Sequence, residues 1–177
     1  LINMTKENKF IPYKIANFSS EELIEKSKKY FQEINNRRSV RDFSDKDVPK
    51  EVIENIIKTA GSAPSGAHKQ PWTFCVISDK KLKSEIRKLA EKEEYENYHA
   101  RMSESWKEDL KAMGTTHIKE FLEAAPYIIV VFKKAYDLDG KENKSQNYYV
   151  NESVGIAVGF LITAIHQAGL VTLTHTP

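Results

Sequence analysis

The sequence of 177 residues has a single cysteine, Cys75, and therefore lacks the pair that an intrachain disulfide requires. Cys75 lies in the apolar run WTFCVI, where a small buried side chain is expected rather than a nucleophile. An excess of one charge is also missing, because 27 lysines and arginines nearly balance 25 aspartates and glutamates. This balance argues against nucleic-acid and membrane-surface binding, so any functional positive charge must be local.

Long apolar runs are absent as well. The longest, residues 154–165, has about half of the ~20 residues that span a bilayer, and the N-terminus lacks the apolar core of a signal peptide. We therefore expect a soluble protein in the reducing cytoplasm. The length suits one domain over residues 1–177, in which residues 1–36 form an N-terminal extension and helix.

The remaining pattern predicts helices and strands in alternation. Helices are expected at residues 21–35, after a cap at Ser19 or Ser20, and at residues 49–61, 80–99, 102–123 and 151–168, and strands at residues 72–78, 127–133 and 169–177. Residues 137–147 are expected to form a solvated loop, and residues 127–133 are apolar enough for a central buried strand. The order indicates an α+β or α/β domain with its sheet inside. The helix at 151–168 is apolar on nearly every side and must be enclosed, in a core or between subunits.

Positive charge is concentrated in the segment RRSVR, residues 37–41. The planar donor fork of arginine fits a phosphate bidentately, and serine adds a short donor beside it. If the segment is extended, Arg37, Ser39 and Arg41 project to one side and Arg38 to the other, so that three donors converge on one phosphate. The alternative is a solvated basic loop that pairs with the nearby acids Asp42, Asp45 and Asp47.

Two further features carry polar groups of interest. The loop APSGAH, residues 63–68, contains a glycine that permits close approach of backbone N–H groups to an anion, although most such loops are only turns. Glu94 and Tyr98 are four residues apart and share one helical face, and Lys119 follows later. By itself this trio is typical of a surface helix and an unrelated lysine.

Together these stretches resemble a known family. The run RRSVRDFSDKDVPKEVIENIIKTAGSAPSGAHKQPWTF resembles the N-terminal FMN-binding signature of the nitroreductase-fold flavoproteins, and the APSGAHKQPW loop with the Glu-Tyr helix resembles their iodotyrosine deiodinase branch. The resemblance covers residues 37–177. It implies a single FMN-binding, nitroreductase-like α+β domain with a central mixed sheet flanked by helices. It also implies an intertwined homodimer, with a C-terminal dimer arm that is missing after residue 177.

The resemblance also implies the residues of a flavin site. FMN would be held by Arg37, Arg38, Ser39, Val40, Arg41, Ser65, Thr174, His175 and Thr176. Thr176 would be the catalytic residue, because a hydroxyl near the flavin N5 favours single-electron chemistry. Without the resemblance, TLTHTP is only the end of a β-rich strand.

The same resemblance implies a lid over the substrate. Glu94 would bind the ammonium of a halotyrosine, Lys119 its carboxylate, and Tyr98 would add a hydroxyl, while the backbone N–H of Ala67 would meet the phenolate oxygen. The implied activity is an oxidoreductase that removes iodide, bromide or chloride from 3-halo-L-tyrosine stacked on the flavin, with 3-iodo-L-tyrosine and 3,5-diiodo-L-tyrosine as substrates. Electrons would come from NAD(P)H, with a possible separate reductase.

Other functions remain open on the sequence alone. The nearest is a general NAD(P)H-dependent nitroreductase or quinone reductase, and another is a non-catalytic flavin-binding or anion-binding protein. Nucleic-acid binding comes last, because the chain as a whole is nearly neutral. The five histidines show no spacing that suggests a metal site.

Overall fold

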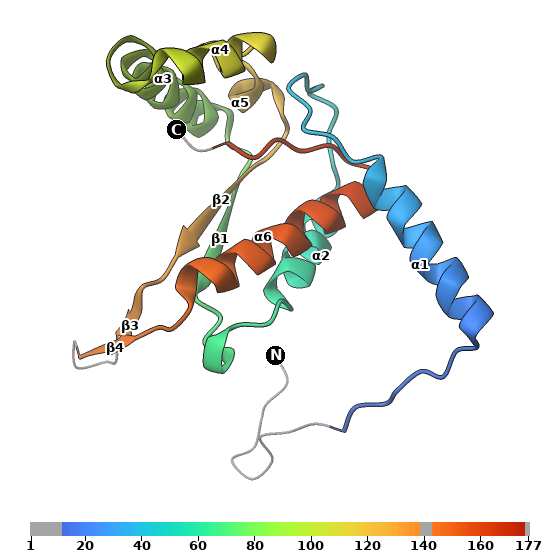
Figure 1. Cartoon of the computed structure of the whole chain (residues 1–177). Coiled ribbons are helices and arrows are strands. Elements are labelled where there is room, and N and C mark those ends of the chain that lie inside the picture. Colours follow the sequence, from blue (N-terminus) through green and yellow to red (C-terminus); the bar gives the residue numbers. More distant parts are fainter. Residues whose placement is uncertain (1–11, 139–142, 176–177) are drawn as a thin grey trace. The chain divides into compact units, whose positions relative to one another are not determined.

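The computed structural model describes residues 12–138 and 143–175, apart from the side chain of residue 112. The chain divides into two units, Leu1–Asn36 and Arg37–Pro177 (Figure 1). None of the helices in the described residues combines the length and the apolar character that crossing a bilayer requires.

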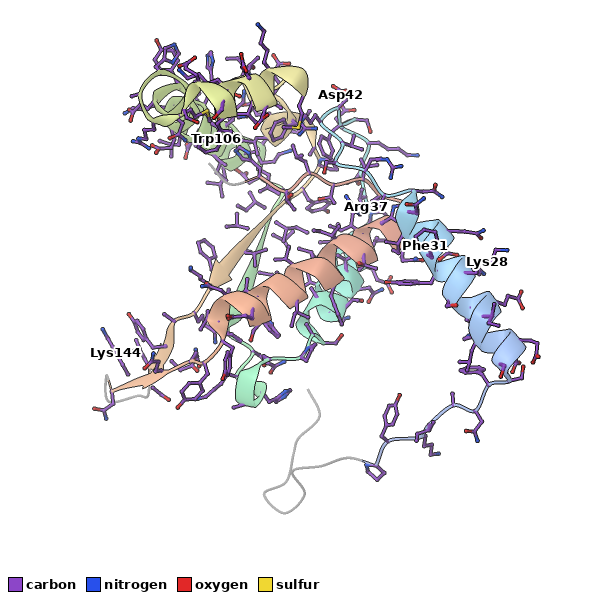
Figure 2. All side chains as sticks on the ribbon, in the orientation of Figure 1. Lys28, Phe31, Arg37, Asp42, Trp106 and Lys144 are labelled. Carbon is purple, nitrogen blue, oxygen red and sulfur yellow. The ribbon has the colours of Figure 1, made fainter. Side chains whose placement is uncertain are left out.

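In the first unit, the described residues from 12 onward form one helix, α1, Ser20–Asn35. It begins with a capping box, in which the backbone N–H of Glu22 donates to Ser19 Oγ and the backbone N–H of Ser19 donates to Glu22 Oε2. The helix therefore forms where the sequence predicts it. None of its residues is buried, and its exposed side chains include Lys28 and Phe31 (Figure 2).

The second unit carries the remaining elements (Figure 1). Its main helices are α2, Lys50–Gly61, α3, Lys80–Glu96, and α6, Val150–Gln167, and they are joined by the shorter α4, Glu104–Ala112, and α5, Phe121–Ala124. A 3₁₀ turn, η1, covers Gly66–His68, and a π-helical turn, η2, covers Asn97–Arg101. The strands are β1, Trp72–Ile77, β2, Ile128–Lys133, β3, Tyr136–Leu138, and β4, Lys144–Gln146.

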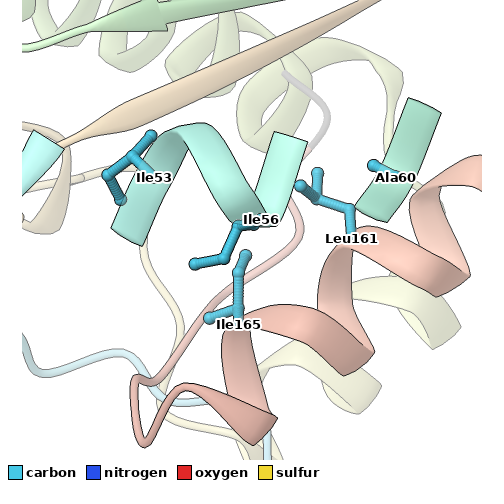
Figure 3. Packing of buried hydrophobic residues seen from close by; sticks show 5 residues of the cluster. All are labelled: Ile53, Ile56, Ala60, Leu161 and Ile165. Carbon is cyan, nitrogen blue, oxygen red and sulfur yellow. The ribbon is translucent and has the colours of Figure 1, made fainter. Parts of the chain in front are cut away.

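The core lies where α2 and α6 pack together against one face of the β1–β2 sheet. Helix α2 places apolar side chains three and four residues apart, so they form one stripe that meets a stripe of α6. Figure 3 shows this cluster, which consists of Ile53, Ile56, Ala60, Leu161 and Ile165. Phe74, Ile129 and Val131 of the sheet close it from the other side.

The sheet differs in part from the sequence prediction. Strands β1 and β2 pair antiparallel, with Phe74 opposite Val131, but within the described residues β2 pairs with β1 alone and is half-buried rather than central. Cys75 points away from the α2–α6 core and is exposed, so the prediction that it is buried is wrong within this chain. The reason is that consecutive residues of a strand face opposite sides, and only the side that carries Phe74 meets the helices.

Two other predictions also need correction. The expected helix over residues 102–123 is broken into α4 and α5, because Gly114 adopts a left-handed φ of 66° and ends the first piece. The expected loop over residues 137–147 contains an antiparallel hairpin of β3 and β4, with Asp137 opposite Ser145. In the described part of the expected last strand, residues 169–175, the pairing is a parallel bridge between Thr172 and Ser39, and residues 176 and 177 lie outside the described residues.

Helix α6 was expected to be enclosed on all sides. In this chain it buries one stripe, made of Ser153, Ala157, Leu161 and Ile165. On another side Ile156 and Phe160 keep 43% and 39% of their surface exposed. The described residues of Arg37–Pro177 therefore leave a second apolar face of α6 uncovered.

Candidate functional site

The first part of the site is a buried ion pair between Glu94 and Lys119. Glu94 lies near the end of α3, and Lys119 lies just before α5, where the break after α4 places it outside any helix. Lys119 Nζ is 3.4 Å from Glu94 Oε2, and both side chains are only 9% exposed. The two residues that the resemblance assigns to an amino-acid zwitterion are thus brought together, each satisfying the charge of the other.

Tyr98 lies one turn beyond Glu94, in the π-helical turn η2. Its hydroxyl donates to the backbone carbonyl of Thr115 at 3.2 Å and lies 3.3 Å from the Thr115 hydroxyl. Single π-helical turns occur frequently at functional sites. Glu94 and Tyr98 therefore lie on one face of α3 and η2, against the segment between α4 and α5 that carries Lys119 and Thr115.

That face of α3 continues toward its N-terminus as a polar stripe. Lys83 Nζ donates to the carbonyls of Glu123 and Ala125, at 3.0 and 2.6 Å. One turn later, Arg87 donates to Glu123 Oε2 at 2.8 Å and to Glu91 Oε1 at 2.7 Å. The contacts of Lys83 and Arg87 with Glu123 and Ala125 thus form a clamp that holds the chain after Lys119 against α3.

His175 connects this region to the end of the chain. Its ring meets Phe121 edge-on with 5.7 Å between ring centroids, and Phe121 also packs 6.5 Å from Phe43. Its Nε2 atom is buried and has no hydrogen-bond partner in the described part of the chain. Burial, and after it the positive charge of Lys119, lower the pKa of His175 below its usual value, whereas Glu94 acts in the opposite direction. The ring is therefore a neutral group with an unused polar atom beside the ion pair.

The basic segment lies next to the same chain end. Ser39 forms its parallel bridge with Thr172, and the N–H of Val40 donates to the Thr172 carbonyl at 3.3 Å. Arg37, labelled in Figure 2, is half-buried, and Arg41 is exposed. Among the described residues, no ion pair joins either arginine to the three acids that follow, Asp42, Asp45 and Asp47.

The loop that contains Ser65 and Ala67 has an unusual backbone. Ala67, His68 and Gln70 adopt left-handed φ values of 48°, 55° and 48°, which cost non-glycine residues about 1–3 kcal/mol each. Ser65 Oγ accepts from the N–H of Gln70 at 2.9 Å and stabilises this shape. Strained backbone of this kind is concentrated at ligand sites, so the loop is a binding-site candidate on its own geometry.

Gly66 fixes the position of that loop against the residues just before α6. A Cβ at this position would come within 3.0 Å of the Tyr149 ring and 3.1 Å of the Tyr148 carbonyl oxygen. The N–H of Gly66 also lies 3.4 Å from Ser153 Oγ, in the first turn of α6. The loop is therefore located at the N-terminal end of α6.

The predicted site residues consequently form two groups. The first group consists of residues 37–41, which lie beside Thr172 in the segment after α6, and of Glu94, Tyr98, Lys119, Thr174 and His175. The second group, Ser65 and Ala67, lies at the N-terminal end of α6, where Gly66 contacts Ser153. Between its two ends, the 18-residue helix α6 rises about 27 Å (Figure 1). The predicted catalytic residue, Thr176, lies outside the described residues.

Sequence reasoning missed Arg87 and Glu91. The signal for them was present, because Lys83, Arg87, Glu91, Glu94 and Tyr98 recur at intervals of three and four residues. What the sequence does not show is that this stripe faces another segment and not water.

The comparisons with known proteins agree with this architecture. A family model described as the nitroreductase family matches residues 34–175. The chain therefore belongs to the nitroreductase family, and the predicted fold class is confirmed.

The relatives narrow the resemblance further. The chain is 60% identical over 176 residues to an iodotyrosine deiodinase of Haliscomenobacter hydrossis, covering 98% of this chain and 78% of that protein. It is 46% identical over 167 residues to iodotyrosine deiodinase 1 of Homo sapiens, of which it spans 58%, while the match covers 94% of this chain. A crystal structure of oxidized iodotyrosine deiodinase bound to FMN and 3-iodo-L-tyrosine superposes with a TM-score of 0.74 at 33% identity, covering 84% of this chain and 74% of that one. The predicted resemblance to iodotyrosine deiodinases is thereby confirmed.

Proposed function

We propose that this chain is an FMN-dependent oxidoreductase that reductively removes halide from 3-halo-L-tyrosine. The carbon–halogen bond of the ring breaks, a carbon–hydrogen bond forms, and halide leaves, which consumes two electrons and one proton. FMN supplies these electrons when it is bound, and they originate from NAD(P)H, directly or through a separate reductase. Iodide, bromide and chloride are all included in the proposal, with 3-iodo-L-tyrosine and 3,5-diiodo-L-tyrosine as substrates.

The observation that carries this proposal is the buried pair of Glu94 and Lys119. An isolated buried charge is costly, so a ligand that binds here must replace both partners at once. A free amino acid does this, since its ammonium pairs with Glu94 and its carboxylate with Lys119. A ligand with only one of these charges leaves the other side chain unpaired. Tyr98 completes this lid, because its hydroxyl lies one turn further along the same face.

The donor set near the chain end fits the phosphate of FMN. Arg37 and Arg41 have no acidic partner among the ion pairs of the described residues, and Ser39 adds a hydroxyl between them. This favours an anion-binding segment over the alternative of a solvated basic loop. His175 Nε2, buried and without a partner among the described residues, is a further group that a bound ring system satisfies.

The position of the second group supports a homodimer. The loop of Ser65 and Ala67 contacts the N-terminal end of α6, whereas the basic segment contacts Thr172, in the segment after its C-terminal end, and the helix between them rises about 27 Å. A second copy brings its own Ser65–Ala67 loop to this chain's arginines, and the N–H of Ala67 then meets the phenolate of a substrate stacked on the flavin. The uncovered apolar face of α6 offers the contact surface.

Anaerobic titration of the reduced, FMN-loaded full-length protein with 3-iodo-L-tyrosine tests the proposal. We expect stoichiometric release of iodide together with reoxidation of the flavin. In the Glu94→Gln and Lys119→Met variants the rate of iodide release should fall by about 100-fold or more, since a desolvated charge pair contributes about 3 kcal/mol or more.

The rival activities give different results in the same assay. Reduction of a nitroaromatic without an amino-acid group should persist in both variants. If wild-type protein reduces nitroaromatics but releases no iodide, the chain is a general nitroreductase. If the reduced flavin is reoxidised by neither compound, it is a non-catalytic flavoprotein.

A further inference from the structure

We propose that Glu91 is a positioning residue, which fixes the backbone of Lys119 so that its ammonium faces Glu94. The proposal deepens the function argued above and rests on it for the identity of the substrate. The immobilisation of Lys119 by Glu91 does not depend on the substrate, because it follows from contacts within the ligand-free protein.

One carboxylate oxygen of Glu91 makes both contacts that matter. Glu91 Oε1 accepts from the backbone N–H of Lys119 at 2.8 Å and from Nε of Arg87 at 2.7 Å. Lys119 lies between α4 and α5, where no helical carbonyl is available to its N–H. Glu91 is therefore the group that satisfies this donor, while Glu94, three residues later on the same face, pairs with the side chain of the same lysine.

Arg87 holds Glu91 in place and extends the contact. Its Nη1 donates to Glu123 Oε2 at 2.8 Å, and Glu123 lies four residues after Lys119. Burial alone would raise the pKa of Glu91, but the N–H of Lys119 and the guanidinium of Arg87 outweigh it and hold that pKa below its usual value. The acceptor thus stays ionised at neutral pH and forms charge-assisted hydrogen bonds, which are roughly twice as strong as neutral ones.

This arrangement is separate from the structural core. The main cluster consists of α2, α6 and one face of the β1–β2 sheet, and none of its described residues comes from α3, whose one buried apolar residue is Ala90. Loss of the Glu91 contact therefore releases the segment around Lys119 without removing core packing. The Lys119 ammonium must be positioned within a few tenths of an ångström to bind the substrate carboxylate. The site therefore binds substrate more weakly when the backbone of Lys119 is free to move.

The experiment compares Glu91→Ala and Glu91→Gln in the FMN-loaded full-length protein. Glutamine keeps a carbonyl oxygen for the N–H of Lys119, whereas alanine removes it. Glu85→Ala, at an exposed position on the same helix, is the matched control. KM and kcat are measured with 3-iodo-L-tyrosine and with 2-iodophenol, which has the ring and halogen but no zwitterion. Amide hydrogen exchange at Lys119 is measured in the ligand-free protein.

We expect Glu91→Ala to raise KM for 3-iodo-L-tyrosine about tenfold or more and to accelerate exchange at Lys119 by a similar factor. Turnover of 2-iodophenol should not change. Glu91→Gln should keep most of the wild-type affinity for 3-iodo-L-tyrosine and most of the protection of the Lys119 amide. Equal losses for the two substrates, or unchanged exchange at Lys119, overturn the proposal. If wild-type protein leaves 3-iodo-L-tyrosine intact, the proposed function fails, and the exchange at Lys119 alone then decides the positioning role.

Discussion

At the scale of single residues, the pairing of Glu94 with Lys119 links stability to ligand choice. Each side chain is 9% exposed, and their charged atoms lie 3.4 Å apart. Taking such charges out of water costs several kcal/mol for each ion, and their mutual attraction offsets this only while both are present. A site of this kind is neutral when empty and neutral again when a zwitterion enters, so it selects against ligands with one charge.

A double-mutant cycle tests this coupling through stability. Glu94→Gln or Lys119→Met alone should lower the free energy of unfolding by about 3–5 kcal/mol, because each leaves a buried charge without its partner. The double variant should lose less than either single one. Urea unfolding of the ligand-free protein measures all three. Losses that simply add would mean that the pair is solvated and uncoupled.

At the scale of secondary structure, α1, α2, α3 and α6 follow from the sequence because their signals are local. A capping box sets the start of α1, and apolar residues at intervals of three and four define the buried stripe of α2. The break between α4 and α5 was not predicted. Charged residues there suggest a continuous helix, but Gly114 ends α4 in a left-handed conformation, and the contacts of Lys83 and Arg87 with residues 123–125 then hold the following chain against α3.

The candidate site, too, could be predicted only in part from the sequence. Residue types and spacing left the arginine segment and the Glu94 face open between a binding role and a solvated surface, and only the family resemblance assigned them to a site. The exposure of Cys75 could not be predicted, because it depends on which side of a strand meets a helix. The contact of Glu91 with the backbone of Lys119 has no sequence signature, since any residue supplies an N–H.

The clamp between α3 and α5 should loosen in acid. The pKa values of Glu91 and Glu123 both lie below the ordinary 4.5 in the folded protein. A carboxylate with a lowered pKa contributes stability above its unfolded value and loses that contribution as the pH falls through its folded value. Exchange at the Lys119 amide, measured from pH 7 down to 3, should therefore show a progressive loss of protection that begins below about 4.5.

The control for this acid response is Glu91→Gln, which has no carboxylate to titrate at that position. Protection of the Lys119 amide in this variant is lower than in the wild type at pH 7. Its further loss of protection between pH 7 and 3 should be smaller than that of the wild type. A variant that follows the wild-type curve would show that other groups cause the acid response. Amides of the α2–α6 core provide the internal reference, because no carboxylate belongs to that cluster.

At the scale of the whole molecule, the two groups of residues proposed for the site lie at opposite ends of α6. The helix also carries an apolar face that the chain itself leaves open, with Ile156 and Phe160 about two-fifths exposed. A two-fold dimer that covers this face and places one chain's loop beside the other chain's arginines resolves both features at once. In such a dimer, a change that prevents dimerisation also prevents the retention of FMN.

This coupling predicts the behaviour of Phe160→Glu. A carboxylate in the middle of the covered face must be desolvated on association, so the variant should sediment as a monomer and lose FMN in parallel. Sedimentation velocity with detection at 280 nm and at a flavin band, about 450 nm, follows both quantities in one run. Leu89→Glu on α3, where the native side chain is 70% exposed, is the control and should stay dimeric and yellow. A Phe160→Glu protein that is monomeric but keeps FMN with wild-type affinity would mean that one chain suffices for the flavin, and the shared site would have to be abandoned.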